Sequence, residues 1–166
     1  MTHEPLNRRT VLASGAALAG AALVTGAPGL LMPARAQALA ATPTMRGGAN
    51  NYIPGAPIVS RIGGGGFWMS GTVRRAGDGA PLAGVRIQVW AHTTEGREDD
   101  RHSHGATLTG PDGVFRLEMP QILPAFGQAH GHLADAGDGF QTVVLRPGLA
   151  SARDKGLSAH FVLQPV

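Results

Sequence analysis

Short runs of β-branched and aromatic residues, separated by turn signals, constrain the fold of this chain more than any other feature. Six such runs occur, at 67–75, 85–92, 113–119, 129–135, 140–147 and 157–165. Clusters of Gly, Asp and Pro separate several of them, at 76–79, 110–113 and 135–139. The domain portion contains no segment with the 3.6-residue periodicity of an amphipathic helix. Strands of this length and spacing predict an all-β domain that forms a single β-sandwich or a barrel.

The strand pattern also predicts which side chains are buried. Apolar and polar residues alternate through 85–90, which indicates one buried and one wet face. We expect Trp90 and Phe126 to be core aromatics, with contact to a flat substrate as the alternative. The chain has no cysteine. Any metal must therefore be held by histidine, carboxylate or tyrosine.

The N-terminus has the three parts of a secretory signal peptide. Arg8 and Arg9 precede a long run rich in Ala, Gly and Leu, and residues 34–36 form an A-x-A cleavage pattern. The arginine pair indicates the twin-arginine export machinery. The alternative, a stable transmembrane anchor, is disfavoured because Pro28 and Pro33 interrupt a run rich in Gly and Ala.

We therefore predict a cleaved signal peptide at 1–36, a linker at 37–50 and a periplasmic or secreted sandwich at 51–166. Loss of residues 1–36 would leave 11 basic and 10 acidic residues, a formal net charge of +1. The basic residues are scattered along the chain, so the sequence has no footprint for nucleic acid. Nothing in the pattern requires an oligomer.

Histidines occur in two H-x-H pairs, His102 with His104 and His130 with His132. Residues i and i+2 of a strand point to the same face, so two ring nitrogens can converge on one ion. The first pair lies in a polar stretch that indicates a loop, where solvated histidines are the alternative. The second pair lies in an apolar strand and is the stronger candidate for a metal site.

Other polar residues have a structural and a functional interpretation. His92 and His160 are expected to be hydrogen-bonded structural histidines. Glu98 belongs to an acidic cluster that is either a solvated loop or a source of a carboxylate ligand. Two histidines and one carboxylate with open positions are typical of non-haem iron oxygen chemistry.

The order of the motifs resembles that of the intradiol ring-cleavage dioxygenases. The similar motifs are G-x-P-L-A-G-V at 79–85, V-W with a later G-R at 89–97, and T-x-x-x-G-x-F at 109–115. The H-x-H pair follows them in the same order. The resemblance implies a β-sandwich of the prealbumin-like type. It also implies cleavage of catechols by ferric iron that is held by two tyrosines and two histidines, the latter being His130 and His132.

The sequence departs from the family at three positions. Glu98 stands where the first ligand tyrosine would follow Gly96 and Arg97. The region of the second tyrosine reads PQILPAFGQ and has only a phenylalanine, and the active-site arginine of the family falls on Gly127. Tyr52 is the only tyrosine and does not match a ligand position.

Together, the resemblance and the departures predict a metal site of His130, His132 and Glu98, with His104 as a fourth group. The expected metal is iron, Fe3+ by resemblance, and Fe2+, copper and zinc are alternatives that the donor set allows. The expected function is oxidative cleavage of a small catechol-type aromatic. The alternative is a non-catalytic metal- or ligand-binding sandwich with a degenerate site.

Overall fold

The computed structural model describes residues 38–135, 137 and 139–166. The chain divides into two units, Met1–Arg35 and Ala36–Val166, and the following description concerns the second. The predicted signal peptide at 1–36 lies outside the described residues. Within the described part of the chain, no helix is long and apolar enough to cross a membrane.

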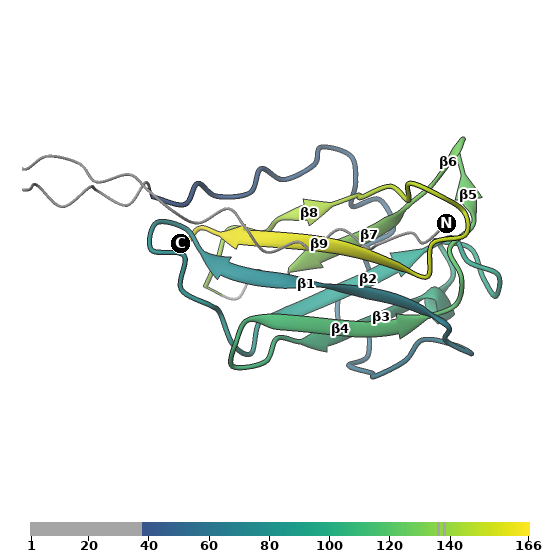
Figure 1. The fold of residues 1–166 in the computed structure, drawn as a ribbon, viewed down its shortest axis with the longest axis horizontal. Helices are drawn as coiled ribbons and strands as arrows, with labels where there is room; N and C mark the ends of the chain where they lie inside the picture. The colour runs from purple at the N-terminus through teal and green to yellow at the C-terminus, as the bar shows by residue number, and fades with distance from the viewer. Residues whose placement is uncertain (1–37, 136, 138) are drawn as a thin grey trace, which may run out of the picture. The chain divides into compact units, whose positions relative to one another are not determined.

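Two sheets face each other and form the predicted all-β sandwich (Figure 1). The three-stranded sheet has the order β4 (Val114–Met119), β1 (Phe67–Arg75), β9 (Gly156–Leu163). The four-stranded sheet has the order β3 (His104–Leu108), β2 (Arg86–Ala91), β7 (Gly131–Asp135), β8 (Val144–Leu145). A 3-10 turn, η1 (Arg101–Ser103), precedes β3, and a small hairpin is made by β5 (Pro124–Ala125) and β6 (Gln128–Ala129).

The core lies between the two sheets and follows the alternation of the strands. Every second residue of β1, β4 and β9 points inward, as the period of two in a strand requires. The fully buried members of the core include Phe67, Met69, Val73, Phe115, Leu117, Phe161, Ile87, Val89 and Leu133. Because both sheets contribute to one continuous cluster, the domain is stabilised mainly by burial of apolar surface.

The prediction of a wet outer face for β2 was wrong. Gln88 and Trp90 point away from the core, yet both are fully buried. Residues 52–59 cover this face: Tyr52 packs edge-on against Trp90, and the backbone N–H of Val59 donates to the carbonyl of Ala106 at 2.9 Å. The alternation correctly separated the two faces, but residues 52–59 exclude water from the outer one.

The segment that we expected to be a linker lies along the sandwich over its described residues. We call residues 39–51 the N-terminal strap. Its backbone N–H groups at Thr42 and Met45 donate to carbonyls of β9 and β8, at 2.9 and 2.8 Å. The hydroxyl of Thr42 accepts the N–H of Val162 at 2.8 Å, and that of Thr44 accepts the N–H of Val144 at 2.9 Å. The strap therefore joins an edge strand of each sheet.

The glycine run at 63–66 leads into β1 and is held by two carboxylates. The N–H of Gly64 donates to Glu95, and the N–H of Gly66 donates to Glu118 at 2.9 Å. Arg61 forms an ion pair of 2.6 Å with the same Glu118. The amides of Gly64 and Gly66 therefore already have anionic partners within the chain.

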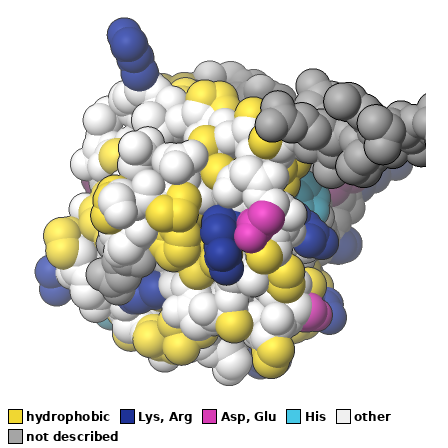
Figure 2. Space-filling view, turned by 90° about the vertical axis from the view of Figure 1, so that its left-hand side faces the viewer, with side chains coloured by type: hydrophobic (Ala, Val, Ile, Leu, Met, Phe, Trp, Pro, Cys, Tyr) yellow, Lys and Arg dark blue, Asp and Glu magenta, His cyan; other side chains and the backbone are white. Residues whose placement is uncertain are grey.

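Figure 2 shows the end of the molecule that lies on the left in Figure 1. Basic side chains are scattered over this face among apolar, uncharged and acidic ones, and they do not form a continuous patch.

Candidate metal centre

Three aromatic rings form a row across the outer face of the four-stranded sheet. Trp90 on β2 is paired with His104 on β3 and with His132 on β7. Side chains that are opposite each other in a sheet share a face. The indole ring consequently stacks on both imidazoles, with centroids 5.7 Å from His104 and 5.2 Å from His132 and planes within 7° and 11°. The sheet register therefore fixes the plane of the His132 ring.

His130 joins His132 on the same face, as the i, i+2 spacing predicts. Their ring centroids are 5.0 Å apart, and both residues are buried. Gly131 lies between them and faces the core, where an added Cβ would come within 2.8 Å of the end of the Met69 side chain. The glycine allows the strand to pack closely on the opposite sheet while the two imidazoles converge on the outer side.

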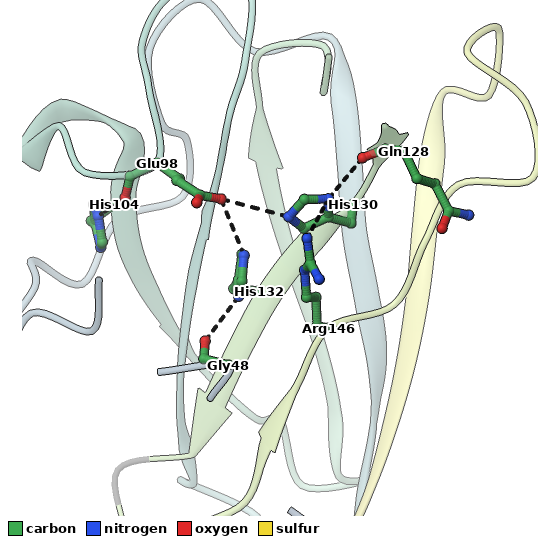
Figure 3. Close-up of polar contacts among 7 residues, drawn as sticks. All are labelled: Gly48, Glu98, His104, Gln128, His130, His132 and Arg146. Carbon is green, nitrogen blue, oxygen red and sulfur yellow. Dashed lines mark hydrogen bonds and ion pairs between the residues drawn. The ribbon is translucent and has the colours of Figure 1, made fainter. Parts of the chain in front are cut away.

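Glu98 reaches the two histidines from the loop between β2 and η1 (Figure 3). Its Oε2 atom is 3.2 Å from Nε2 of His132 and 3.6 Å from Nε2 of His130. The side chain of Glu98 is 18% exposed. One ligand atom from each residue lies within 4.8 Å of the others. The structure thus brings together three of the four residues that the sequence singled out.

Two backbone carbonyls fix the protonation of the imidazoles. Nδ1 of His132 is 2.9 Å from the carbonyl oxygen of Gly48, and Nδ1 of His130 is 2.8 Å from that of Gln128. A carbonyl oxygen can only accept a hydrogen bond, so each Nδ1 carries the proton. In the neutral imidazole, each Nε2 atom then carries a lone pair, and both Nε2 atoms face Glu98. The 3.2 Å contact between Nε2 of His132 and Oε2 of Glu98 is a hydrogen bond only in the doubly protonated ring. Nε2 of His130 is buried and has no hydrogen-bond partner among the described residues.

The three converging atoms fit a bound cation. Two imidazole lone pairs and a carboxylate oxygen face one another, and a positive charge between them would satisfy all three. Burial lowers the pKa of His132, although the Glu98 carboxylate and the Gly48 carbonyl act to raise it. The neutral imidazole, the form that binds metals, is therefore favoured. These donors are the two histidines and one carboxylate that are typical of non-haem iron sites.

His104 does not join this group, contrary to our expectation of a fourth ligand. Its ring lies on the far side of Trp90 from His132. Nε2 of His104 is 2.9 Å from the backbone carbonyl of Glu98, and Nδ1 is 3.3 Å from the amide of Gln88. His104 therefore orients the backbone that carries Glu98. Burial lowers its pKa as well, so the ring is neutral and Nε2–H donates to the carbonyl.

The remaining described histidines also lie outside the group. His102 is exposed on η1, and His160 is exposed on β9, where its Nδ1 is 2.9 Å from the Thr72 hydroxyl. His92 is half-buried and lines a neighbouring cavity. Tyr52, the only tyrosine, packs edge-on against Trp90 with ring centroids 6.1 Å apart.

Two cavities open beside the three donors, and both contain Glu98, Asn51 and Phe126 in their walls. One has a volume of about 350 Å³ and also contains His92 and Arg97. The other has a volume of about 430 Å³ and also contains His132 and Arg146. The larger cavity therefore gives a small molecule direct access to two of the three donor residues.

Phe126 stands at the rim shared by these cavities, and our expectation of a core aromatic was wrong. It is 89% exposed. Phe126 and Gly127 form the two-residue loop of the β5–β6 hairpin, with φ of 52° and 96°. Two positive φ angles are typical of the tight turns that connect antiparallel strands, where Asn and Gly are preferred. For phenylalanine this conformation costs roughly 1–2 kcal/mol. The missing Asn-Gly signal explains why the hairpin was not predicted.

Comparison with known sequences gave no match: no family profile and no curated protein is significantly similar to the chain. Solved structures do match. One is 3-chlorocatechol 1,2-dioxygenase from Rhodococcus opacus 1CP, with a TM-score of 0.57, 19% identity, and coverage of 76% of this chain and 73% of that one. Another is hydroxyquinol 1,2-dioxygenase from Pseudomonas putida DLL-E4, with a TM-score of 0.60, 15% identity, and coverage of 79% and 69%.

A third match is the dioxygenase domain of a dioxygenase carbohydrate-binding protein fusion from Streptomyces sp. SirexAA-E. Its TM-score is 0.57 and its identity 19%, over 76% of this chain and 100% of that domain. The chain is thus similar in fold to the intradiol dioxygenases, and the resemblance expected from its motifs is confirmed at the level of fold.

Proposed function

We propose that this protein binds one metal ion through Glu98, His130 and His132 and uses it for oxidative chemistry on a catechol-type aromatic. The observation that carries the proposal is the convergence of three lone-pair donors whose protons are fixed elsewhere. Both Nδ1 atoms are within hydrogen-bond distance of carbonyl oxygens, and both Nε2 atoms face the same carboxylate oxygen.

The choice of iron and of a catechol rests on two supports. Two histidines and one carboxylate with open positions suit non-haem iron. The solved structures with this fold include enzymes named for catechol, 3-chlorocatechol and hydroxyquinol. The tyrosines that the family resemblance implies as ligands have no counterpart, so we propose the carboxylate of Glu98 in place of one tyrosinate.

Each residue of the site has a defined task in this proposal. Glu98, His130 and His132 hold the ion, which would supply Lewis-acid and redox chemistry toward a catechol and O₂. Gly48 and Gln128 hold the imidazole protons away from the ion, and His104 holds the backbone of Glu98. The larger cavity admits a flat substrate beside Glu98 and His132.

We also propose that the protein acts outside the cytoplasm. The support lies in the sequence alone, in Arg8 and Arg9, the apolar run and the A-x-A pattern at 34–36. Cytoplasmic retention of a fusion that carries residues 1–60 would overturn this proposal.

The first test is metal analysis of protein that has been matured by its own export route. We expect about one iron per chain. His130→Ala and Glu98→Gln should lose most of the metal, because removal of one of three protein ligands leaves an incomplete site. His102→Ala is the matched control, since this exposed histidine lies outside the group and should keep the metal content unchanged.

The second test is conversion of catechols, followed by O₂ consumption and by mass spectrometry of the product. A ring-opened product that carries both atoms of O₂ supports the proposal. Stoichiometric metal without turnover of any catechol would instead favour the alternative function, a non-catalytic metal-binding sandwich. Absence of metal from the wild-type protein, combined with unchanged stability of His130→Ala, would overturn both functions.

A further inference from the structure

The larger cavity has one basic side chain in its wall, Arg146, which follows β8. The guanidinium points toward His130 in Figure 3. Its Nη2 atom is 3.4 Å from Nδ1 of His130. That Nδ1 already donates to Gln128 at 2.8 Å and carries a proton, so it cannot accept from the arginine. The guanidinium is left without an acceptor at this contact, next to the candidate metal centre.

The neighbouring cavity differs in charge. Its basic side chain, Arg97, lies 3.4 Å from the carboxylate of Asp99, which is also part of that cavity. Within the described part of the chain, no carboxylate forms such an ion pair with Arg146. Because a guanidinium remains charged at any physiological pH, the larger cavity presents a positive group that no ion pair neutralises. The one carboxylate in its wall, Glu98, faces the two histidines instead.

The larger cavity also offers an apolar surface for an aromatic ring, and Phe126 provides it. This side chain is 89% exposed and belongs to the wall of the same cavity. Its backbone is held at a φ of 52°, a conformation that phenylalanine rarely adopts. An exposed aromatic ring at the rim of a cavity can pack on a flat ligand. Asn50 and Asn51 add neutral polar groups to the wall.

We propose that the larger cavity selects aromatic substrates that carry an anionic substituent. This inference rests on the proposed function, because it names the substrate class of the same site. Arg146 pairs with the anionic group, and a guanidinium can do so through two parallel hydrogen bonds. Phe126 packs on the ring. Arg146 is thus the specificity-determining residue and Phe126 adds affinity for the ring; both line the same cavity as the donors Glu98 and His132.

The test is a charge series of three catechols that bind to metal-loaded protein without O₂, measured by calorimetry. The probes are 3,4-dihydroxybenzoate, catechol and 3,4-dihydroxybenzylamine, which are anionic, neutral and cationic at neutral pH. We expect the anion to bind roughly ten- to hundredfold more tightly than neutral catechol, as one charge-assisted pair provides. The cation should bind most weakly.

Substitutions distinguish the contribution of Arg146 to probe binding from that of the other residues of the site. Arg146→Ala should remove the preference for the anion and leave the affinity for catechol unchanged, with equal metal content. Arg146→Lys should retain part of the preference, because it keeps the charge but not the planar fork. Arg97→Ala is the matched control and should keep the whole preference. Phe126→Ala should weaken all three probes by a similar factor.

Equal binding of the three probes to the wild-type protein would overturn the proposal, as would a preference that survives in Arg146→Ala or disappears in Arg97→Ala. Loss of metal in Arg146→Ala would overturn it too, since the arginine would then act through His130. These outcomes are distinct from failure of the proposed function. That failure appears as a wild-type protein without metal or without turnover, whatever the ranking of the three probes by affinity.

Discussion

Nδ1 of His132 lies 2.9 Å from the carbonyl oxygen of Gly48, a residue that precedes it by 84 positions in the chain. The contact joins a strand of the sandwich to the N-terminal strap. It holds the proton of the imidazole on the side that faces away from Glu98, and so keeps the Nε2 lone pair directed at the other two donors. A segment without regular secondary structure therefore contributes to the candidate metal centre through its backbone.

Loosening the strap should weaken metal binding. Thr42→Val together with Thr44→Val removes the acceptors for the N–H groups of Val162 and Val144. Each lost hydrogen bond costs about 1 kcal/mol, and the Gly48 carbonyl becomes free to move. We expect metal affinity to fall by about tenfold, as happens when a partner of a metal ligand is disturbed.

A chelator competition would measure this affinity, and nitrogen NMR would report the tautomer of His132. Thr94→Val is the control, because this threonine is exposed and lies outside the strap. If the double variant kept its metal affinity although its strap was shown to be mobile, the strap would not contribute to metal binding.

Removal of the central ring of the stack should destabilise the domain. Trp90 is fully buried between two imidazoles. Trp90→Ala should lower the free energy of unfolding by about 3–5 kcal/mol, and Trp90→Phe by less. Urea titration measures the loss. Trp68→Ala is the matched control: this residue is 39% exposed and stacks with Arg116 at 4.4 Å. Its loss should cost about 1 kcal/mol or less.

A methyl group between the two histidines should destabilise the domain. The added Cβ in Gly131→Ala would lie 2.8 Å from Cε of Met69 and 3.4 Å from Cδ2 of Leu157. The expected loss is about 1–3 kcal/mol in chemical denaturation, because the core must shift to accept it. In a Met69→Ala background the same change should cost less. An identical loss in both backgrounds would contradict this packing account.

Replacement of Glu118 should destabilise the domain in a pH-dependent way. Its hydrogen bond from the N–H of Gly66 and its ion pair with Arg61 lower the pKa of this carboxyl group. A lowered pKa adds stability above the pKa of the unfolded chain, and that stability is lost as pH falls through the folded pKa. Glu118→Gln should therefore be less stable than the wild type near pH 7. The two proteins should converge as pH drops below about 4. Thermal melts at several pH values would check this, and a constant difference would contradict it.

Phe126→Asn should make the protein more stable and a weaker binder of aromatic probes. Asparagine tolerates a positive φ better than phenylalanine, so the gain should be about 1 kcal/mol. Denaturation and calorimetry on the same variant would measure both effects. Ile58→Asn is the control, because Ile58 is 59% exposed and does not have a positive φ. If Phe126→Asn gained no stability, the backbone strain assigned to Phe126 would be wrong.

Much of the sandwich could be predicted from sequence because burial repeats every second residue along its strands. β1 coincides with the predicted run at 67–75, and parts of the other five runs form β2, β4, β7, β8 and β9. β3 was missed because its polar approach, 95–105, indicated a loop. The position of Trp90 against the two histidines follows from register between distant strands, which no local pattern contains.

The candidate site was likewise predictable from local sequence patterns only in part. The H-x-H spacing predicted that His130 and His132 share a face, and the departure from the family pattern singled out Glu98. Whether His104 would reach them depended on which side of Trp90 it lies, and this is a property of the sheet alone. The parts supplied by the strap and by Phe126 have no local signature. A backbone carbonyl leaves no mark in the sequence, and the turn at 126–127 lacks the usual Asn-Gly pair.

The contacts of the strap also bear on the order in which the chain folds. Its side-chain and backbone bonds to Val144, Val162 and His132 span 100, 120 and 84 residues. Contacts of such long sequence separation form late, because large loops must close before any stabilisation is gained. His132 would thus acquire its final orientation only after the last strands are in place. Metal capture would then be a late step, and would distinguish completed domains from chains that have only collapsed.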